Sequence, residues 1–283
     1  MLEIKNIRKT YGKFNLECSM KVEDGCITGL IGENGAGKST TFKAIENLIS
    51  LDSGEITIFG KPHDRLSVEE RRKIGVVLSG STFSETFHVK DIVKILKAFY
   101  PDFQKETFLS RCEEYQIPLN KPLKGFSTGM KAKLKVLIAL SYQAKFLILD
   151  EPTAGLDVVA RESILNLLRE YMEEDDRRSI LISSHISGDL EGLCDDAYMI
   201  HKGKIIFHED MDTLMSEYGL LKVTEEQYLH LDKEYLLQIK KEPYGYSCLT
   251  NQLFFYKENY PDITIEKGNL DEVIMMTIKG EKI

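Results

Sequence analysis

A glycine-rich segment carries the clearest chemical pattern in this sequence. Residues 32–40 read GENGAGKST and satisfy the spacing G-x-x-x-x-G-K-[ST]. Gly35 and Gly37 allow the backbone to approach a ligand closely, and a helix that begins there adds the positive end of its dipole. Lys38 has the reach to contact the β- and γ-phosphates of a nucleotide, and the hydroxyl of Ser39 is suited to ligate Mg²⁺. The segment therefore predicts a loop that binds a triphosphate.

The residues on either side of this loop support the prediction. The apolar run CITGLI (residues 26–31) precedes it, and TFKAIENLI (residues 41–49) continues as a helical pattern. An ordinary glycine-rich turn is the alternative, but it leaves the lysine and the two hydroxyls at the helix start unexplained. We assign nucleotide contacts to the whole loop, which consists of Gly32, Glu33, Asn34, Gly35, Ala36, Gly37, Lys38, Ser39 and Thr40.

Two acidic residues end a second apolar run. The segment FLILDEP (residues 146–152) reads as a buried strand that ends at Asp150 and Glu151. A carboxylate at the carboxyl end of a parallel strand lies at the crevice where ligands bind, so Asp150 is predicted to hold Mg²⁺. Glu151 is predicted to be catalytic, because a carboxylate there can orient and deprotonate an attacking water. A solvated turn before Pro152 is the alternative. We favour a functional role because a phosphate-binding loop is predicted upstream at residues 32–40.

A histidine follows the next apolar strand. The segment SILISSH (residues 179–185) ends at His185, one strand away from Glu151. A lone histidine is more often structural, but a histidine at this strand end is in position to contact a γ-phosphate. The strand position alone leaves both roles open for His185.

The alternation of short apolar runs with longer helical patterns predicts the fold that positions these residues. Strands that are apolar throughout are typical of a parallel sheet covered on both faces, so the fold class is α/β. Residues from about 84 to 143 turn mostly helical and predict a helical subdomain inserted between two strands. The opening stretch and EITIFGK (residues 55–61) predict an antiparallel β subdomain. A small accessory region, residues 218–283, is expected after a main unit of residues 1–217.

Composition narrows the class of protein. Lysine and arginine total 37 against 45 aspartate and glutamate, and the net charge of −8 repels a nucleic-acid backbone on average. The five cysteines form no CxxC pair, so neither a disulfide framework nor a zinc site is expected. No run reaches the roughly 18 to 20 apolar residues of a membrane-spanning helix. We expect no nucleic-acid partner, a cytoplasmic location, and another chain to cross any membrane that this protein serves.

Together these residues resemble those of the ABC-type ATPases, and a short segment between the loop and the acidic pair is the diagnostic part. Residues 126–130 read FSTGM, similar to the family's signature loop, usually LSGGQ, with Ser127 and Gly129 matching. The resemblance implies that Ser127, Thr128 and Gly129 contact the γ-phosphate held by another subunit. A simple N-cap turn is the alternative for this segment alone, since serine and threonine are favoured before helices. The segment precedes a helix that runs into the FLILDEP strand, which is where the family has its signature loop.

The resemblance covers about residues 2–212 and implies further details. The fold is that of a P-loop NTPase with a RecA-like core and a parallel sheet. Tyr11 is similar to the aromatic residue that stacks on adenine, and AGLD (residues 154–157) is similar to the loop that contacts the opposite subunit. His185 is similar to the family's switch histidine, which implies a catalytic role for it. One position departs from the pattern, because Ser79 stands where the family has a glutamine that bonds Mg²⁺ and senses the membrane partner. A serine is shorter than a glutamine, so metal contact at Ser79 stays open.

The resemblance implies an ATP-binding and ATP-hydrolysing subunit of an ABC transporter, of the bacterial single-cassette type. Such a subunit uses ATP and Mg²⁺ and pairs with a second ABC ATPase subunit, identical or different. It drives an integral membrane subunit on a separate chain from the inner face of the cell membrane, with export favoured by analogy. Two alternatives stay open: a soluble ABC ATPase that acts on the ribosome or chromosome, and a degenerate ATP-binding partner subunit. The sequence does not identify the cargo.

Overall fold

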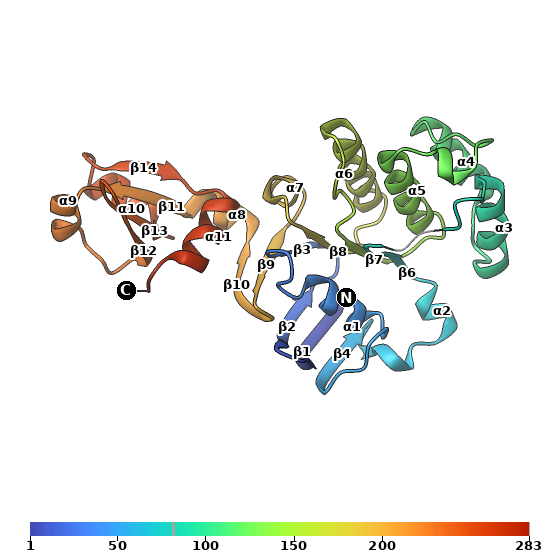
Figure 1. The fold of residues 1–283 in the computed structure, drawn as a ribbon, viewed down its shortest axis with the longest axis horizontal. Helices are drawn as coiled ribbons and strands as arrows, with labels where there is room; N and C mark the ends of the chain where they lie inside the picture. The colour runs from blue at the N-terminus through green and yellow to red at the C-terminus, as the bar shows by residue number, and fades with distance from the viewer. Residues whose placement is uncertain (81–82, 283) are drawn as a thin grey trace.

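The computed structural model describes residues 1–80 and 83–282. They form one large sheet of ten strands, the helices that cover it, and a separate sheet of four strands. Figure 1 shows the smaller sheet at one end of the molecule and a group of inserted helices at the other. The α/β class predicted from the sequence is confirmed.

Five neighbouring strands form the parallel half of the large sheet, in the order β9-β3-β8-β7-β6. They are β3 (Ile27–Ile31), β6 (Ile74–Val77), β7 (Phe146–Asp150), β8 (Ser179–Ser184) and β9 (Asp196–His201). Every residue of β3, β7 and β8 is buried, as expected for central strands that are covered on both faces. β3 leads into α1 (Lys38–Ile45), and α6 (Val158–Glu173) returns the chain from β7 to β8.

The other half of the large sheet is mainly antiparallel. β1 (Leu2–Tyr11) pairs with β2 (Phe14–Val22) and β4 (Ser53–Ile58), while β10 (Lys204–Asp210) pairs with β9. The predicted antiparallel subdomain is present, but it is continuous with the parallel half. A single register pair, Lys204 with Glu17, connects β2 to β10, and β10 in turn pairs with β9 of the parallel half.

Three helices are inserted between β6 and β7, as the sequence predicted. They are α3 (Val89–Phe99), α4 (Lys105–Glu114) and α5 (Thr128–Leu140). The buried residues of α3 recur at helical spacing, so one face of the helix is apolar and packs into the main core. Figure 1 shows these helices beyond α6, on the side of the molecule away from the second sheet.

The C-terminal unit is built on the second sheet, in the order β12-β13-β11-β14. Its antiparallel strands are β11 (Gly219–Val223), β12 (Leu236–Glu242), β13 (Gly245–Thr250) and β14 (Thr264–Lys267), connected in part by α9 (Glu225–His230) and α10 (Leu253–Asn259). This β-α-β-β-α-β order is ferredoxin-like. Alternate side chains face opposite sides, so Leu221 packs with α10 while Leu220 joins the main core beside α11 (Leu270–Lys279). The boundary at residue 217 stays a prediction.

Short elements complete the chain: β5 (Lys61–Pro62), η1 (His63–Arg65), α2 (Val68–Arg71), η2 (Leu123–Gly125), α7 (Ser187–Glu191) and α8 (Met211–Glu217). All five cysteines are free thiols. Within the described ranges, no helix combines the length and the apolar character that a membrane crossing requires.

Candidate nucleotide site

The carboxyl ends of four strands meet at one edge of the large sheet. β3, β8, β7 and β6 are consecutive parallel neighbours. β3 leads into residues 32–40, β7 ends at Asp150, β8 ends just before His185, and β6 ends two residues before Ser79. Because parallel strands end at the same edge, this topology brings together four segments that are far apart in the sequence.

The backbone of the glycine-rich loop explains why Gly37 and Gly32 carry no side chain. Gly37, the residue before α1, has a φ of 121°, which residues with a side chain rarely adopt. A Cβ on Gly32 would lie 2.4 Å from the carbonyl oxygen of Ile200 in β9. The loop therefore lies directly against β9. The first N–H groups of α1 have no partner within the helix, and together with the helix dipole they favour an anion at this point.

Lys38 lies against the loop and is shielded from solvent. Its side chain is 5% exposed, and its Nζ donates a hydrogen bond of 2.5 Å to the carbonyl of Gly32. The same nitrogen lies 3.2 Å from Oε1 of Glu151. The structure thus places the predicted phosphate-binding cation and the predicted catalytic carboxylate in one ion pair.

Glu151 links Lys38 to His185. Its Oε2 lies 2.5 Å from Nδ1 of His185, and its own side chain is 13% exposed. The backbone of Glu151 has a φ of 53°, an uncommon conformation for a residue with a Cβ that costs on the order of 1 kcal/mol. The hydroxyl of Ser183 accepts its N–H at 3.0 Å and helps to hold this conformation. The two predicted catalytic side chains are therefore in direct contact.

Asp150 is buried behind this pair. Its side chain is 2% exposed and accepts hydrogen bonds from Ser79 Oγ at 2.6 Å and from Ser183 Oγ at 2.8 Å. Ser39, in the first turn of α1, lines the cavity in front of it. Carboxylate and hydroxyl oxygens are the hard donors that Mg²⁺ prefers, so this donor set fits the ion. Ser79, the residue that departs from the family pattern, is a partner of Asp150.

A cavity of about 490 Å³ lies over these strand ends, within the roughly 300–1,000 Å³ common for small-molecule sites. Ten of the predicted site residues line it: Glu33, Asn34, Gly35, Gly37, Lys38, Ser39, Thr40, Ser79, Glu151 and His185. Gly32, Ala36 and Asp150 are buried and do not line the cavity. The cavity thus gathers polar groups from the loop and from three other strand ends.

The aromatic residue at the cavity differs from the predicted one. Tyr11 is 47% exposed and does not line the cavity, whereas Phe14 does. The two residues are cross-strand partners at the turn between β1 and β2. The sequence analysis missed Phe14, although a second aromatic residue in the same predicted hairpin was a usable signal. Ala154 also lines the cavity, and its segment was predicted only to contact another subunit. A role for Tyr11 in stacking on adenine stays a prediction.

The FSTGM segment does not contribute to the cavity of its own chain. Ser127 caps α5, since its Oγ accepts the N–H of Met130 at 3.2 Å. α5 begins at Thr128, directly after this cap. Ser127 and Thr128 are exposed, and Gly129 packs against Ala160 of α6. None of the three predicted signature residues lines the cavity.

Comparisons with known proteins agree on one family. A family model described as ABC transporter matches residues 16–154. The lantibiotic transport ATP-binding protein SrtF of Streptococcus pyogenes is 34% identical over 224 residues, which cover 75% of this chain and 92% of that protein. The bacitracin transport ATP-binding protein BcrA of Bacillus licheniformis is 32% identical over 219 residues, which cover 76% of this chain and 71% of that protein.

Solved structures share the fold. The structure of an ATP-binding subunit of an ABC transporter aligns with a TM-score of 0.67 and 28% identity, and the match covers 76% of this chain and 91% of that one. The ATP-binding cassette MJ0796, solved as a dimer in a post-hydrolysis state with ADP and Pi, aligns with a TM-score of 0.64 and covers 75% of this chain and 99% of that one. Its identity of 22% carries the likeness no further than the fold.

Proposed function

This chain belongs to the ABC transporter family of ATP-binding proteins, and we propose that it hydrolyses Mg-ATP at the loop of residues 32–40 to drive a separate membrane subunit. One observation carries the assignment of roles. The two carboxylate oxygens of Glu151 contact Lys38 and His185 beside the loop. A base, a cation and an imidazole are thus held together at the site assigned to the terminal phosphate.

The loop and Lys38 bind the triphosphate. N–H groups of the loop and of the first turn of α1 donate to phosphate oxygens. Lys38 has three N–H donors, which the carbonyls of Gly32 and Glu33 and the carboxylate of Glu151 engage in the structure. The oxygens of a triphosphate together carry more negative charge than one carboxylate, and they compete with both partners for these donors. Nucleotide binding therefore releases Glu151 from Lys38, and Phe14 and Tyr11 offer aromatic surface to the adenine ring.

Ser39 and Asp150 are the residues we assign to Mg²⁺. When bound, this ion neutralises the charge that develops on the phosphate oxygens. The hydroxyls of Ser79 and Ser183 hold Asp150 in a fixed orientation. We assign Ser79 the positioning of Asp150, a role that differs from direct ligation by a glutamine amide.

Glu151 is the base that accepts a proton from the attacking water. General-base catalysis contributes about 10²- to 10⁴-fold to a rate. His185 presents Nδ1 to Glu151, which leaves Nε2 for an oxygen of the γ-phosphate. The two carboxylates thus have different roles. Asp150, held by two serines, is assigned to Mg²⁺, and Glu151, in contact with His185, is assigned to the attacking water.

A second ABC ATPase subunit, identical or different, completes the site. Ser127, Thr128 and Gly129 stand at the start of α5, where unsatisfied N–H groups and the helix dipole favour a phosphate. Their absence from the cavity of their own chain supports a contact with the nucleotide of a second subunit. ATP then joins the two subunits, and loss of the γ-phosphate removes that contact and lets them separate.

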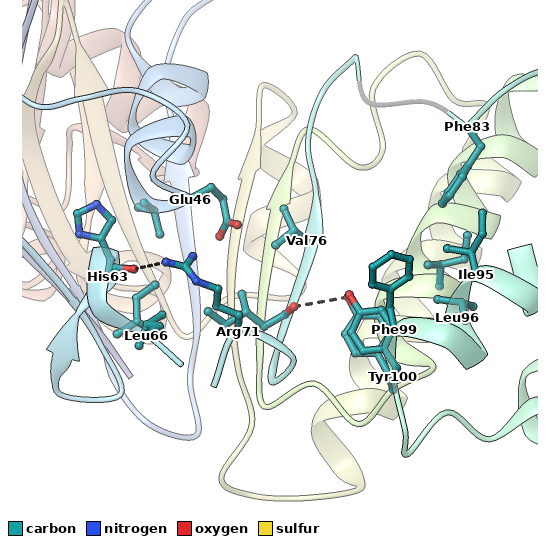
Figure 2. Close-up of a pocket in the computed structure, with 15 residues that line it drawn as sticks. Glu46, His63, Leu66, Arg71, Val76, Phe83, Ile95, Leu96, Phe99 and Tyr100 are labelled. Carbon is teal, nitrogen blue, oxygen red and sulfur yellow. Dashed lines mark hydrogen bonds between the residues drawn. The ribbon is translucent and has the colours of Figure 1, made fainter. Parts of the chain in front are cut away.

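A groove outside the nucleotide cavity is assigned to the membrane subunit. Figure 2 shows it between His63, Leu66 and Arg71 on one side and Phe99 and Tyr100 on the other. The groove measures about 420 Å³, and most of its lining is apolar. Phe99 is 64% exposed at its edge, and exposed aromatic residues often anchor protein partners. A helical segment of the membrane subunit fits this surface and holds the chain at the inner face of the cell membrane.

Export is the direction we propose for this transporter. Two similar proteins are named for transport of a lantibiotic and of bacitracin. The FSTGM segment together with Ser79 is similar to bacterial cassettes that serve peptide or antibiotic exporters with separate membrane chains. The cargo is chosen by the membrane subunit and is left open.

The replacement Glu151→Gln tests the proposed function. The isolated, concentrated protein should hydrolyse ATP, and the variant should retain ATP binding while its kcat falls by about 10²- to 10⁴-fold. With ATP and Mg²⁺ the variant should elute as a dimer in size-exclusion chromatography. A variant as active as the original chain, or one that stays monomeric at saturating ATP, would refute this mechanism. No turnover in either protein would favour the degenerate-subunit alternative.

A further inference from the structure

The short helix α7 lies between the site and the C-terminal unit, and none of the roles above uses its contacts. It begins two residues after His185. Leu190 of α7 is fully buried in the same core cluster as Leu270 and Val273 of α11. One helix of five residues therefore follows a predicted catalytic side chain and packs on the C-terminal unit.

On the cassette side, Asp189 ties α7 to the segment that follows Glu151. Asp189 is 2% exposed, and its Oδ2 accepts a hydrogen bond of 2.7 Å from the hydroxyl of Thr153, which is also buried. Its Oδ1 lies 3.2 Å from Nε of Arg161 in α6. Hydrogen bonds to a buried charge are strong and directional. Asp189 therefore fixes the spacing between the turn that carries Glu151 and the segment that carries His185.

On the other side, Glu191 ties α7 to α11. Its Oε1 accepts a hydrogen bond of 2.7 Å from the N–H of Leu270, the first residue of α11. Asn269, the N-cap of the same helix, accepts the N–H of Glu272. The two side chains satisfy two of the N–H groups that have no partner within a helix, and the charge of Glu191 also suits the helix dipole. The N-terminus of α11 is thus held in part by a residue of the cassette.

We propose that α7 is a positioning element for ATP hydrolysis, through which the C-terminal unit acts on the cassette. Asp189 sets the spacing of Glu151 and His185, and Glu191 couples that spacing to α11. Neither Asp189 nor Glu191 lines the nucleotide cavity, so both position catalytic groups without touching the nucleotide. A displacement of α11 moves α7 and alters the approach of His185 to Glu151. The inference rests on the roles proposed above for those two residues.

Three variants of the full chain test this coupling. Glu191→Ala removes the acceptor of the Leu270 N–H, whereas Glu191→Gln keeps an oxygen at the same position. Thr224→Ala is the matched control, because it removes the N-cap of α9, which is in the same C-terminal unit but packs on β11 and β13. Glu191→Ala should lower kcat about 3- to 10-fold, because only part of the free energy of the lost hydrogen bond is transmitted to Glu151 and His185, and it should leave KM for ATP within twofold. Glu191→Gln and Thr224→Ala should keep the original kcat.

The imidazole of His185 supplies a second measurement that does not require turnover. Its ring nitrogen resonances in a long-range ¹H–¹⁵N spectrum should shift in Glu191→Ala and stay unchanged in the other two variants. Unchanged kcat and unchanged His185 resonances in Glu191→Ala would overturn the inference, as would equal loss of kcat in Thr224→Ala. If Glu151→Gln loses activity while Glu191→Ala does not, only the coupling fails. If the original chain shows no turnover, the proposed function fails and the His185 resonances alone decide on the coupling.

Discussion

The nucleotide cavity and the groove of Figure 2 are similar in size, about 490 and 420 Å³, but they are built in different ways. The cavity is lined mostly by one loop and by three strand ends, whose polar side chains hold one another. The groove is lined mainly by apolar side chains from α1, β4, α3 and α5 and from the segments between these elements. Chemistry on a phosphate requires given residue types at given spacings, whereas a docking surface requires apolar area of a suitable shape. This difference predicts that a substitution can impair ATP binding without affecting binding to the membrane subunit, and the reverse.

The largest effect is expected from Lys38→Ala in the nucleotide cavity. The change removes a cation that donates charge-assisted hydrogen bonds, each worth about 1.5–3 kcal/mol. ATP affinity should fall at least about 100-fold, measured by titration calorimetry. Lys43→Ala is the control, since Lys43 is an exposed lysine of the same helix and does not line the cavity. Equal affinities in the two variants would contradict the assignment of Lys38 to the phosphates.

A smaller and separate effect is expected from Phe99→Ser in the groove. Loss of an exposed aromatic anchor should weaken binding to the membrane subunit about 10- to 100-fold, measured by co-purification and surface plasmon resonance. ATP hydrolysis by the isolated chain should stay unchanged, because Phe99 does not line the nucleotide cavity. Phe254→Ser is the matched control, since Phe254 is 61% exposed but lies in α10 of the C-terminal unit. If both variants bind the partner normally, the groove is not the docking site.

The smallest effect concerns Glu46, which lies in the groove at the end of α1. Its Oε1 is buried and has no hydrogen-bond partner among the described residues. Figure 2 shows Glu46 in the groove together with Arg71. Burial raises the pKa of this carboxyl to about 7, and the nearby Arg71 opposes part of that rise. The folded chain therefore binds this proton more tightly than the unfolded chain, whose glutamate has a pKa of about 4.3. The stabilising contribution is present below about pH 4 and is lost as the pH rises to about 7.

The replacement Glu46→Gln should remove this pH dependence. Relative to the original chain, the variant should gain about 1–2 kcal/mol of unfolding free energy between pH 5 and pH 8, allowing for the partial exposure of the side chain. Urea denaturation at the two pH values measures the difference. A constant difference between the two proteins at both pH values would show that Glu46 is charged in the folded chain across this range.

The sequence predicted which segments meet at the cavity, because most of the predicted residues are contiguous or stand at strand ends. The loop of residues 32–40 and the pair Asp150 and Glu151 fall in the positions that their motifs imply. Phe14 was missed because the strand twist and the turn between β1 and β2 decide which aromatic residue faces the loop. The bond between Ser79 and Asp150 was not foreseen either, since it depends on the order of β6 and β7 in the sheet.

The C-terminal unit shows where sequence patterns stop being sufficient. A small accessory region was predicted there, and the structure has short strands after Tyr218 and a helix capped by Asn269. Glu272 stands at capping-box spacing, but only the Asn269 half of the reciprocal pair is formed. The strand order and the contact of Leu270 with Glu191 depend on packing between distant segments, which no local pattern encodes. The groove escaped prediction for the same reason.

At Glu151, the residue that gives the most stable backbone differs from the residue that activity requires. A glycine would adopt a φ of 53° without steric cost and relieve on the order of 1 kcal/mol of strain. It would also remove the carboxylate that we propose as the base for hydrolysis. Selection for stability alone would thus favour an inactive protein. Selection for activity retains the strained backbone, whose free-energy cost must be offset by the packing of the surrounding core.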